Sequence, residues 1–308
     1  MAESGARRRL VPSTESIGRC MVCCFFVFLS QLALISVSHF FSTSSFLAQL
    51  CLSAAVLLVI TGLGGRCRRL IGVSASAPAF VVVTIVYTWS VYTAVVRQAV
   101  SRFMDVLFNG EVALLMIGLC SMFTMDPGLV ADGDPSSSRL AECQTENPPL
   151  AGRVRFCRIC KAYVKGFDHH CPAFGNCIGQ NNYVLFMALL VGFLSTEASF
   201  VACSYQFLAK SQTSHQTRFD STLDMDVVNG AMLFSFLQLL WQAIFFAWHV
   251  YCVCFNIKTE EWVNWKRYPE FQVLIEDEQV QGHSGTQFRN PYDKGIQQNV
   301  NEFFILTR

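Results

Sequence analysis

The sequence predicts an all-α integral membrane protein with about six transmembrane helices and a cysteine-rich cytosolic loop between the fourth and the fifth. Three observations support this prediction. Of the 308 residues, 52% are hydrophobic and only 15% are charged, whereas soluble domains carry about 25% charged residues. Six apolar stretches approach the roughly 20 residues that cross a bilayer. Several cysteines and histidines crowd into one polar segment between the fourth and fifth stretches.

The low charge also excludes several classes of function. The formal net charge is +1 and the mean hydropathy is +0.37. Neither a disordered acidic chain nor a basic nucleic-acid-binding protein has this composition. We therefore expect the lipid bilayer as a partner, and no nucleic acid.

Four of the apolar stretches precede the cysteine-rich segment and two follow it. Because backbone amides in hydrocarbon need partners within the same segment, each stretch predicts a helix. The fourth is the weakest, since Asn109, Gly110 and Glu111 interrupt it. Only residues 42–45 separate the first two, and a re-entrant hairpin is the alternative to two full spans. The predicted spans cover residues 20–41, 46–64, 78–96, 105–125, 183–208 and 227–255.

The distribution of Lys and Arg predicts the orientation in the membrane. With six spans, one side holds both termini, the 65–77 loop and the cysteine-rich segment. That side carries 19 of the 23 Lys and Arg residues, and positive charge favours the cytosol. We expect cytosolic regions at 1–19, 126–182 and 256–308, separated by membrane regions at 20–125 and 183–255.

The 14 cysteines fall into groups. A cytosolic orientation argues against disulfides, and Cys51, Cys120 and Cys203 lie within spans as small apolar side chains. Cysteines near the cytosolic span ends either pack or accept S-acylation; these are Cys20, Cys23, Cys24, Cys67, Cys252 and Cys254. Cys143 stands alone early in the cysteine-rich segment, and the remaining four cysteines occur within 21 residues of that segment.

This last group predicts a zinc site. Cys157 and Cys160 have the spacing that presents two thiolates to one ion. A tetrahedral structural site needs two further ligands. The candidates are His169, His170, Cys171 and Cys177. They offer more donors than one zinc ion can use, and the surplus suggests a second role.

A carboxylate, an imidazole and a thiol follow one another closely in this segment. A thiol attacks as its thiolate. A neighbouring histidine can take the proton, and an aspartate can orient that histidine. Asp168, His169 and Cys171 therefore form a candidate catalytic group, although adjacency alone does not bring them together.

The run Asp168-His169-His170-Cys171, with Asn176 and Asn182 after it, resembles the signature of the DHHC protein S-acyltransferases. These membrane enzymes attach palmitate or related fatty acyl groups to protein cysteines. Elements similar to others of the family are DPG at 126–128, TTxE at 258–261 and NPYDKG at 290–295. Lys258 replaces the first Thr of TTxE. The supporting residues in these elements are Asp126, Pro127, Gly128, Thr259 and Glu261; two more are Asn182, after the Asp-His-His-Cys run, and Asn299, beyond NPYDKG.

The resemblance implies a role for each residue of the cluster. Cys171 would be the nucleophile that takes the acyl group from acyl-CoA, His169 its base, and Asp168 the residue that orients His169. The implied zinc ligands are Cys157, Cys160, His170 and Cys177. Candidates for holding the CoA phosphates are Arg153, Arg155, Arg158, Lys161 and Lys165. Cysteine-containing membrane-associated proteins would be the acceptors, and an endomembrane (Golgi or endoplasmic reticulum) the location.

The sequence also departs from the family pattern. The family usually binds two zinc ions through two Cys3His sets. The second set falls on Cys143, Glu146, Phe156 and Tyr163, of which only Cys143 is a ligand type expected there. We expect a single zinc ion, with the two aromatic residues packing at the other site. Ala173 stands where the family has Trp after Cys-Pro, and Phe174 follows as another aromatic surface.

Two other classes of function compete with acyl transfer. A zinc-stapled membrane scaffold would use the cluster for structure alone and would need neither Asp168 nor a reactive thiol. A six-span transporter or channel would carry charged residues within its spans. Glu111 and Glu197 are nearly the only candidates.

Overall fold

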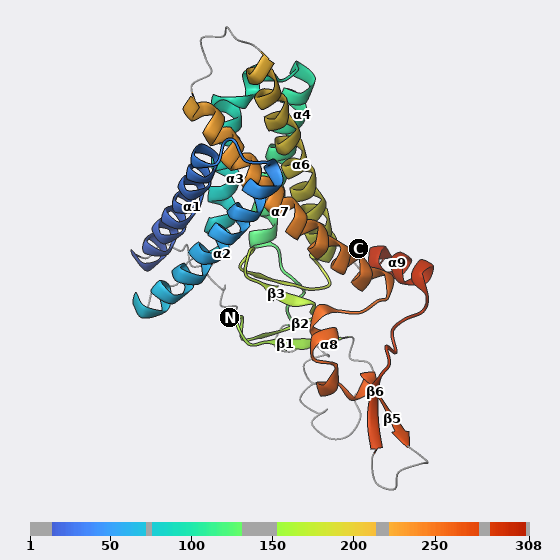
Figure 1. Cartoon of the computed structure of the whole chain (residues 1–308). Coiled ribbons are helices and arrows are strands. Elements are labelled where there is room, and N and C mark those ends of the chain that lie inside the picture. Colours follow the sequence, from blue (N-terminus) through green and yellow to red (C-terminus); the bar gives the residue numbers. More distant parts are fainter. Residues whose placement is uncertain (1–13, 72–75, 131–152, 214–221, 277–283, 306–308) are drawn as a thin grey trace, which may run out of the picture. The chain divides into compact units, whose positions relative to one another are not determined.

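The computed structural model describes residues 14–71, 76–130, 153–213, 222–276 and 284–305, so the predicted N-terminal tail lies largely outside the described residues (Figure 1). Its six long helices are α1 (Thr14–Phe40), α2 (Phe46–Ile71), α3 (Ala77–Ala94), α4 (Arg102–Thr124), α6 (Tyr183–Thr213) and α7 (Thr222–Cys254). Each contains an apolar stretch of 18 to 33 residues that is long enough to cross a membrane. The prediction of six membrane helices, four before the cysteine-rich segment and two after it, is confirmed.

The first two helices are each long enough to span separately. The apolar part of α1 has 24 residues and that of α2 has 21, against a requirement of about 20. These lengths favour two full spans over a re-entrant hairpin. Side chains such as Leu58 and Val106 are each 73% exposed, as expected for helix faces that contact lipid.

The weakest predicted span forms a continuous helix, and one of its polar residues, Asn109, finds partners inside the protein. Asn109 Nδ2 on α4 donates to the backbone oxygen of Asp105 at 2.8 Å. Its Oδ1 accepts a hydrogen bond from Trp89 Nε1 on α3 at 3.0 Å. Unsatisfied polar groups are costly in hydrocarbon, and these bonds remove that cost for Asn109.

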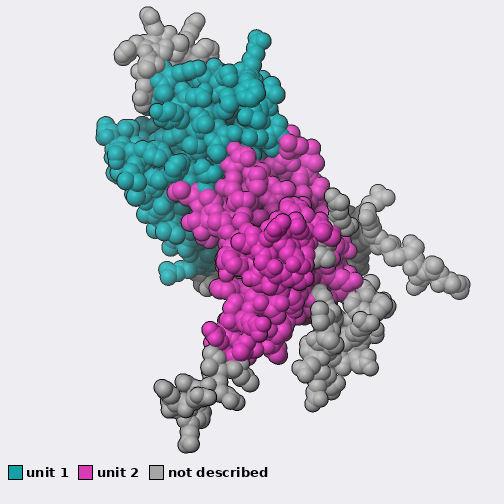
Figure 2. Space-filling model, turned by 90° about the vertical axis from the view of Figure 1, so that its right-hand side faces the viewer, with its two compact units in different colours: residues 1–112, 196–239 teal, residues 113–195, 240–308 magenta. Residues whose placement is uncertain are grey.

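The chain divides into two compact units, coloured separately in Figure 2. The first comprises residues 1–112 and 196–239. Within it, Asn229 Nδ2 on α7 donates to Ser38 Oγ at 3.1 Å and to Gln49 Oε1 at 2.8 Å. His39 Nδ1 lies 2.7 Å from Asp226 Oδ2. Polar contacts thus connect α1 and α2 to α7.

The second unit, residues 113–195 and 240–308, contains the cysteine-rich segment. Along the chain, two short hairpins follow α4 and precede α6 (Figure 1). Strand β1 (Arg155–Cys157) pairs antiparallel with β2 (Ala162–Val164), and β3 (His169–Cys171) with β4 (Asn176–Ile178). After α7 come α8 (Thr259–Val263), the 3₁₀ turns η2 (Trp265–Arg267) and η3 (Pro269–Phe271), the hairpin β5 (Gln272–Glu276) and β6 (Ser284–Phe288), and α9 (Ile296–Ile305).

The Asp126-Pro127-Gly128 element joins α4 to these hairpins. Asp126 Oδ1 accepts hydrogen bonds from the backbone amides of Gly128 and Leu129, both at 2.8 Å. Gly128 has a φ of +105°, which L side chains rarely adopt. Its carbonyl accepts from the Lys165 amide at 2.8 Å, at the end of β2. The turn therefore fixes where the hairpins begin relative to the end of α4.

Candidate functional site

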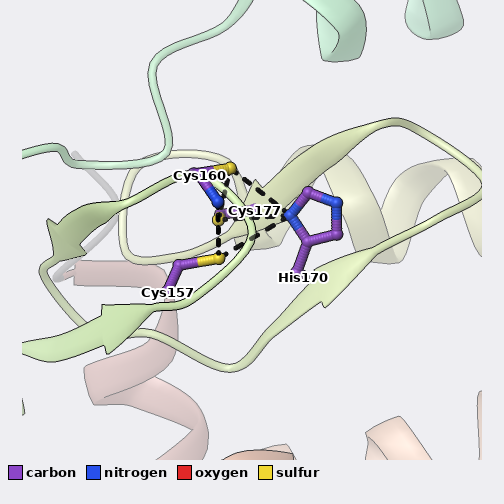
Figure 3. Close-up of side chains that lie close together, drawn as sticks. All are labelled: Cys157, Cys160, His170 and Cys177. Carbon is purple, nitrogen blue, oxygen red and sulfur yellow. Dashed lines mark hydrogen bonds between the residues drawn. The ribbon is translucent and has the colours of Figure 1, made fainter.

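One side-chain cluster unites the two hairpins. Cys157 ends β1, Cys160 lies in the following turn, and His170 in β3 faces Cys177 in β4 across the strand pair. Their ligand atoms all lie within 4.8 Å of one another, and Figure 3 shows them converging. This cluster could bind a metal ion.

The spacing of the donor atoms fits zinc. The three cysteine sulfurs lie 3.4, 3.7 and 3.8 Å from His170 Nδ1. Cys177 Sγ lies 3.5 Å from Cys160 Sγ. Tetrahedral zinc with Zn–S near 2.3 Å and Zn–N near 2.0 Å places its ligand atoms about 3.5–3.8 Å apart. Of the four candidates for the remaining two ligands, the structure brings His170 and Cys177 to the cluster.

His169 and Cys171 lie in a different environment from His170. Successive side chains of a strand point to opposite faces, so the residues flanking His170 in β3 turn away from the sulfur cluster. His169 Nδ1 instead lies 2.7 Å from Asp168 Oδ2. Cys171 lies two residues after His169 in the same strand, and its side chain is near enough to raise the pKa of the His169 ring. The structure thus brings together all three residues of the predicted catalytic group.

Burial and hydrogen bonding set the charges of this group. The Asp168 side chain is inaccessible to solvent. Burial opposes its ionisation, but the hydrogen bond and charge of His169, with the charge of Lys258, hold its pKa well below the ordinary value. Burial alone would lower the pKa of His169; its hydrogen bond with Asp168 and the influence of the nearby Cys171 side chain outweigh that effect and raise the pKa to about 9. The imidazole is therefore more basic than an ordinary histidine, and near neutral pH it retains a proton that it takes from the thiol.

The segment after α7 holds Asp168 in place. The backbone amide of Thr259 donates to Asp168 Oδ1 at 3.0 Å, and the amide of Glu260 donates to the Asp168 carbonyl at 2.9 Å. The buried Glu261 carboxylate accepts from Arg153 Nη2 at 2.9 Å and from the Lys258 amide at 3.0 Å. The predicted supporting residues Thr259 and Glu261 therefore lie at the site and brace it.

Two further supporting residues satisfy backbone groups. Asn182 Oδ1 accepts from the Gly179 amide at 2.9 Å, and its Nδ2 donates to the Cys177 carbonyl at 2.8 Å. Asn299 Nδ2 donates to the Cys254 carbonyl at 2.8 Å. Asn182 thus secures the end of β4, and Asn299 secures the end of α7.

Sequence reasoning missed two residues next to the hydrogen-bonded pair of Asp168 and His169. His249 on α7 is fully buried, and its ring centre lies 5.6 Å from that of His169. Tyr183 at the start of α6 places its hydroxyl 3.2 Å from His249 Nδ1. Both lie in predicted spans and were treated as membrane residues only. A histidine inside an apolar stretch is the signal that could have identified the first.

The spacing of Asp168, His169 and His249 is also compatible with a metal ion, since their ligand atoms lie within 4.8 Å of one another. The short bond between Asp168 Oδ2 and His169 Nδ1 already engages two of those atoms. Aromatic rings surround the group. The ring centre of Phe186 lies 5.5 Å from that of His169 and 6.0 Å from that of the buried Phe174. At this site the hydrogen-bonded pair of Asp168 and His169 is surrounded by apolar side chains.

The candidate phosphate-binding cations differ in their surroundings. Arg153 is engaged by Glu261, and Arg155 Nη2 lies 2.6 Å from Glu270 Oε1. Arg158 and Lys161 are exposed in the β1–β2 turn. Arg153 and Arg155 therefore contribute to the internal structure, and the exposed pair is better placed to meet a phosphate.

An aromatic pair occupies the expected second metal position. Phe156 and Tyr163 are direct partners in the β1–β2 register, with ring centres 5.0 Å apart. Each remains nearly half exposed, at 45% and 44%. Cys143 and Glu146, the other two positions of that set, lie outside the described residues. The pair shields one face of the hairpin without a metal-binding donor.

Sequence comparison with known proteins relates the segment that contains this cluster to a known family. Residues 136–266 match the family model for the DHHC palmitoyltransferase. Palmitoyltransferase ZDHHC17 of Mus musculus is 28% identical over 160 residues, which are 49% of this chain and 24% of that protein. Probable protein S-acyltransferase 1 of Arabidopsis thaliana is 30% identical over 166 residues, 53% of this chain and 41% of that protein. Palmitoyltransferase ZDHHC7 of Mus musculus is 25% identical over 171 residues, 50% of this chain and 54% of that protein. The similarity thus spans between about a quarter and about half of each relative.

Proposed function

Because this chain belongs to the DHHC palmitoyltransferase family, we propose that it transfers a long-chain fatty acyl group such as palmitoyl from acyl-CoA to cysteines of other proteins. One observation carries the proposal. Cys171 and His169 lie on the same side of β3, and His169 Nδ1 lies 2.7 Å from the carboxylate of the buried Asp168. A thiol, a base and an orienting carboxylate in this order form a nucleophile ready for activation.

In the first half-reaction, His169 takes the proton from Cys171, and the thiolate attacks the thioester carbonyl of acyl-CoA. The bond to the CoA sulfur breaks, and His169 returns the proton to the departing CoA thiol. The acyl group is then held as a thioester on Cys171. Asp168 stabilises the imidazolium that forms in between.

In the second half-reaction, the acceptor protein's cysteine replaces CoA. His169 takes the proton from the acceptor thiol, which attacks the acyl carbonyl. The bond to Cys171 Sγ breaks, and His169 returns the proton to Cys171. The 20% exposure of the His169 side chain supports access by both substrates.

A zinc ion held by Cys157, Cys160, His170 and Cys177 would have a structural role, because four protein ligands leave no open position for a substrate. It would cross-link the two hairpins and thereby hold β3. Phe156 and Tyr163 supply no donor at the other position, which supports one zinc ion per chain. Metal analysis of the purified protein tests this stoichiometry, and a value near two would overturn it.

The membrane arrangement follows the charge distribution. We propose that both termini and the cysteine-rich segment face the cytosol, where acyl-CoA is available, since 19 of 23 Lys and Arg residues lie on that side of six spans. Acceptors are then cysteines of proteins at the cytosolic membrane surface. The family relationship supports a Golgi or endoplasmic reticulum membrane, and protease protection with organelle markers tests both statements.

Acyl transfer can be tested with the purified protein and a clickable palmitoyl-CoA analogue. We expect label on the wild type that hydroxylamine removes, because hydroxylamine cleaves thioesters. Cys171→Ser should abolish it. Cys254→Ser is the matched control, since Cys254 lies at the end of α7 away from the proposed roles and its variant should still label.

A zinc-stapled scaffold gives the opposite result. It would show no hydroxylamine-sensitive label at Cys171, while still binding zinc through the same four ligands. Labelling that persists in Cys171→Ser would remove this residue from its proposed role.

A further inference from the structure

Lys258 stands where the TTxE element has its first threonine, immediately before α8. Its ammonium nitrogen lies 4.2 Å from the centre of the Tyr183 ring. Tyr183 is 1% exposed, and its hydroxyl lies 3.2 Å from His249 Nδ1. The next residue after Lys258, Thr259, donates its backbone amide to Asp168 Oδ1 at 3.0 Å. The substitution therefore introduces a positive charge beside the buried carboxylate of the proposed catalytic group.

The charged and titratable groups around Lys258 come from several elements. Asp168, on the approach to β3, and Glu261, on α8, are acidic, whereas Arg153, before β1, is basic. Cys252 and His249 face it from α7. Arg153 and Glu261 already form a pair at 2.9 Å. Asp168 is therefore the acidic group nearby that still lacks a permanent positive partner.

Asp168 needs such a partner because of the proposed reaction. His169 balances the carboxylate charge only while it carries a proton, and it gives that proton away in each half-reaction. A buried carboxylate without a counter-charge is strongly disfavoured. A lysine at position 258 carries its charge throughout the cycle.

We propose that Lys258 is a positioning residue for acyl transfer, whose ammonium group is a fixed counter-charge that holds the Asp168 carboxylate toward His169. The proposal rests on the proposed function. It assigns to Lys258 a role that the threonine of the usual element could not perform, because a hydroxyl carries no charge.

The charge of Lys258 can be removed by pH as well as by mutation. Burial lowers the pKa of Lys258 to about 8, against the opposing influence of Asp168. The ammonium is therefore present below that pH and is lost as the pH rises through about 8. Arginine at the same position would remain charged over this range.

The test measures acyl transfer to a cysteine peptide between about pH 7 and pH 9.5 for the wild type, Lys258→Met and Lys258→Arg. At pH 7 we expect Lys258→Met to be roughly tenfold slower than the wild type, the effect of about one pKa unit. The ratio of wild-type to Lys258→Arg rates should fall as the pH rises through about 8. The ratio of Lys258→Met to Lys258→Arg rates should fall less, since methionine has no charge to lose. Because the rates are compared as ratios at each pH, the titration of other groups, which affects all three proteins alike, cancels.

Controls separate this role from folding. Lys266→Met removes an exposed lysine of η2 and should match the wild type at every pH. Zinc content and thermal stability show whether each variant is folded, and Lys258→Thr provides a second uncharged variant with the side chain usual at this position. Lys258→Thr should share the slow rate of Lys258→Met.

The proposal is overturned by either of two results in active, folded protein. One is a ratio of wild-type to Lys258→Arg rates that does not change with pH. The other is a wild-type rate in both Lys258→Met and Lys258→Thr at pH 7. An inactive wild type would instead contradict the proposed function, so the two failures are distinguishable.

Discussion

His169 and His170 are adjacent residues of strand β3, yet their imidazoles have different partners. His170 Nδ1 has three cysteine sulfurs at 3.4 to 3.8 Å, whereas His169 Nδ1 bonds to a carboxylate at 2.7 Å. The alternation of side chains along a strand separates the two. One three-residue strand thus supplies the proposed metal ligand on one face and the proposed base and nucleophile on the other.

This difference suggests that the face of β3 with His170 (the metal face) stabilises the strand, whereas the face with His169 and Cys171 carries out the proposed reaction. A shift of one residue in the β3–β4 register would exchange the two faces. Cross-linking of β3 to β1 and β4 through the metal cluster would prevent such a shift. Mutations on each face should therefore have distinct signatures in zinc content, stability and transfer rate.

The largest expected effect is on the metal face. His170→Ala removes one of four ligands, and a structural zinc ion contributes roughly 10 kcal/mol or more to the folding of small zinc domains. We expect zinc content to fall well below one per chain, with a lower thermal transition and lost transfer. Retention of stoichiometric zinc would show that His170 is not a ligand.

On the opposite face, His169→Ala should slow transfer by roughly 10²- to 10⁴-fold, the usual contribution of general acid–base catalysis. Zinc content and thermal stability should stay close to those of the wild type. Elemental analysis and transfer kinetics on the same preparation provide the check. Zinc loss with a normal rate would reverse the two histidine assignments.

A smaller effect should follow from removing one support of Asp168. Thr259→Pro deletes the amide that bonds to Asp168 Oδ1, and proline is tolerated at the first position of a helix such as α8. Lys258 before it already has an extended backbone, with φ −97° and ψ 149°. Hydrogen bonds to charged groups contribute about 1.5–3 kcal/mol, so transfer should slow by roughly tenfold or more.

Thr259→Ala is the matched control for that variant, because it keeps the backbone amide and loses only the side chain. It should transfer faster than Thr259→Pro. Equal rates would mean that the amide of residue 259 does not support Asp168.

The smallest effect is expected at the aromatic pair. Phe156→Ala removes one partner of a pair that is nearly half exposed, and such pairs contribute about 0.5–1.5 kcal/mol. We expect a lower thermal transition with unchanged zinc content. Ile159→Ala, at a position 68% exposed in the same hairpin, should change stability less. Zinc loss in Phe156→Ala alone would place this residue nearer the metal than we infer.

Several features of the fold could be predicted because they depend on local composition. The six spans follow from length and apolarity, and α4 was predicted despite its polar interruption. The structure accounts for that interruption with partners such as Trp89, on a different helix. The extent of each helix was less predictable: α7 begins at Thr222, five residues before the predicted span.

The candidate site was predictable as a set of residues, because Cys157-x₂-Cys160 and Asp168 to Cys171 are close in sequence. Its surroundings were not. His249 and Lys258 lie about 80 and 90 positions away from Asp168, and the residues around them in the sequence do not show that they pack beside β3. The engagement of Arg153 and Arg155 by Glu261 and Glu270 likewise depends on the folding of the segment after α7.

The sequence by itself determined the class of protein, the number of membrane helices and the residue types available for metal binding and acyl transfer. These depend on the periodicity, length and spacing of neighbouring residues. Tertiary structure decided which histidine joins the cysteines, since that choice depends on which face of β3 meets β1 and β4. It also decided that the segment after α7 braces Asp168, because hydrogen bonds to a buried carboxylate form only when distant parts of the chain pack together.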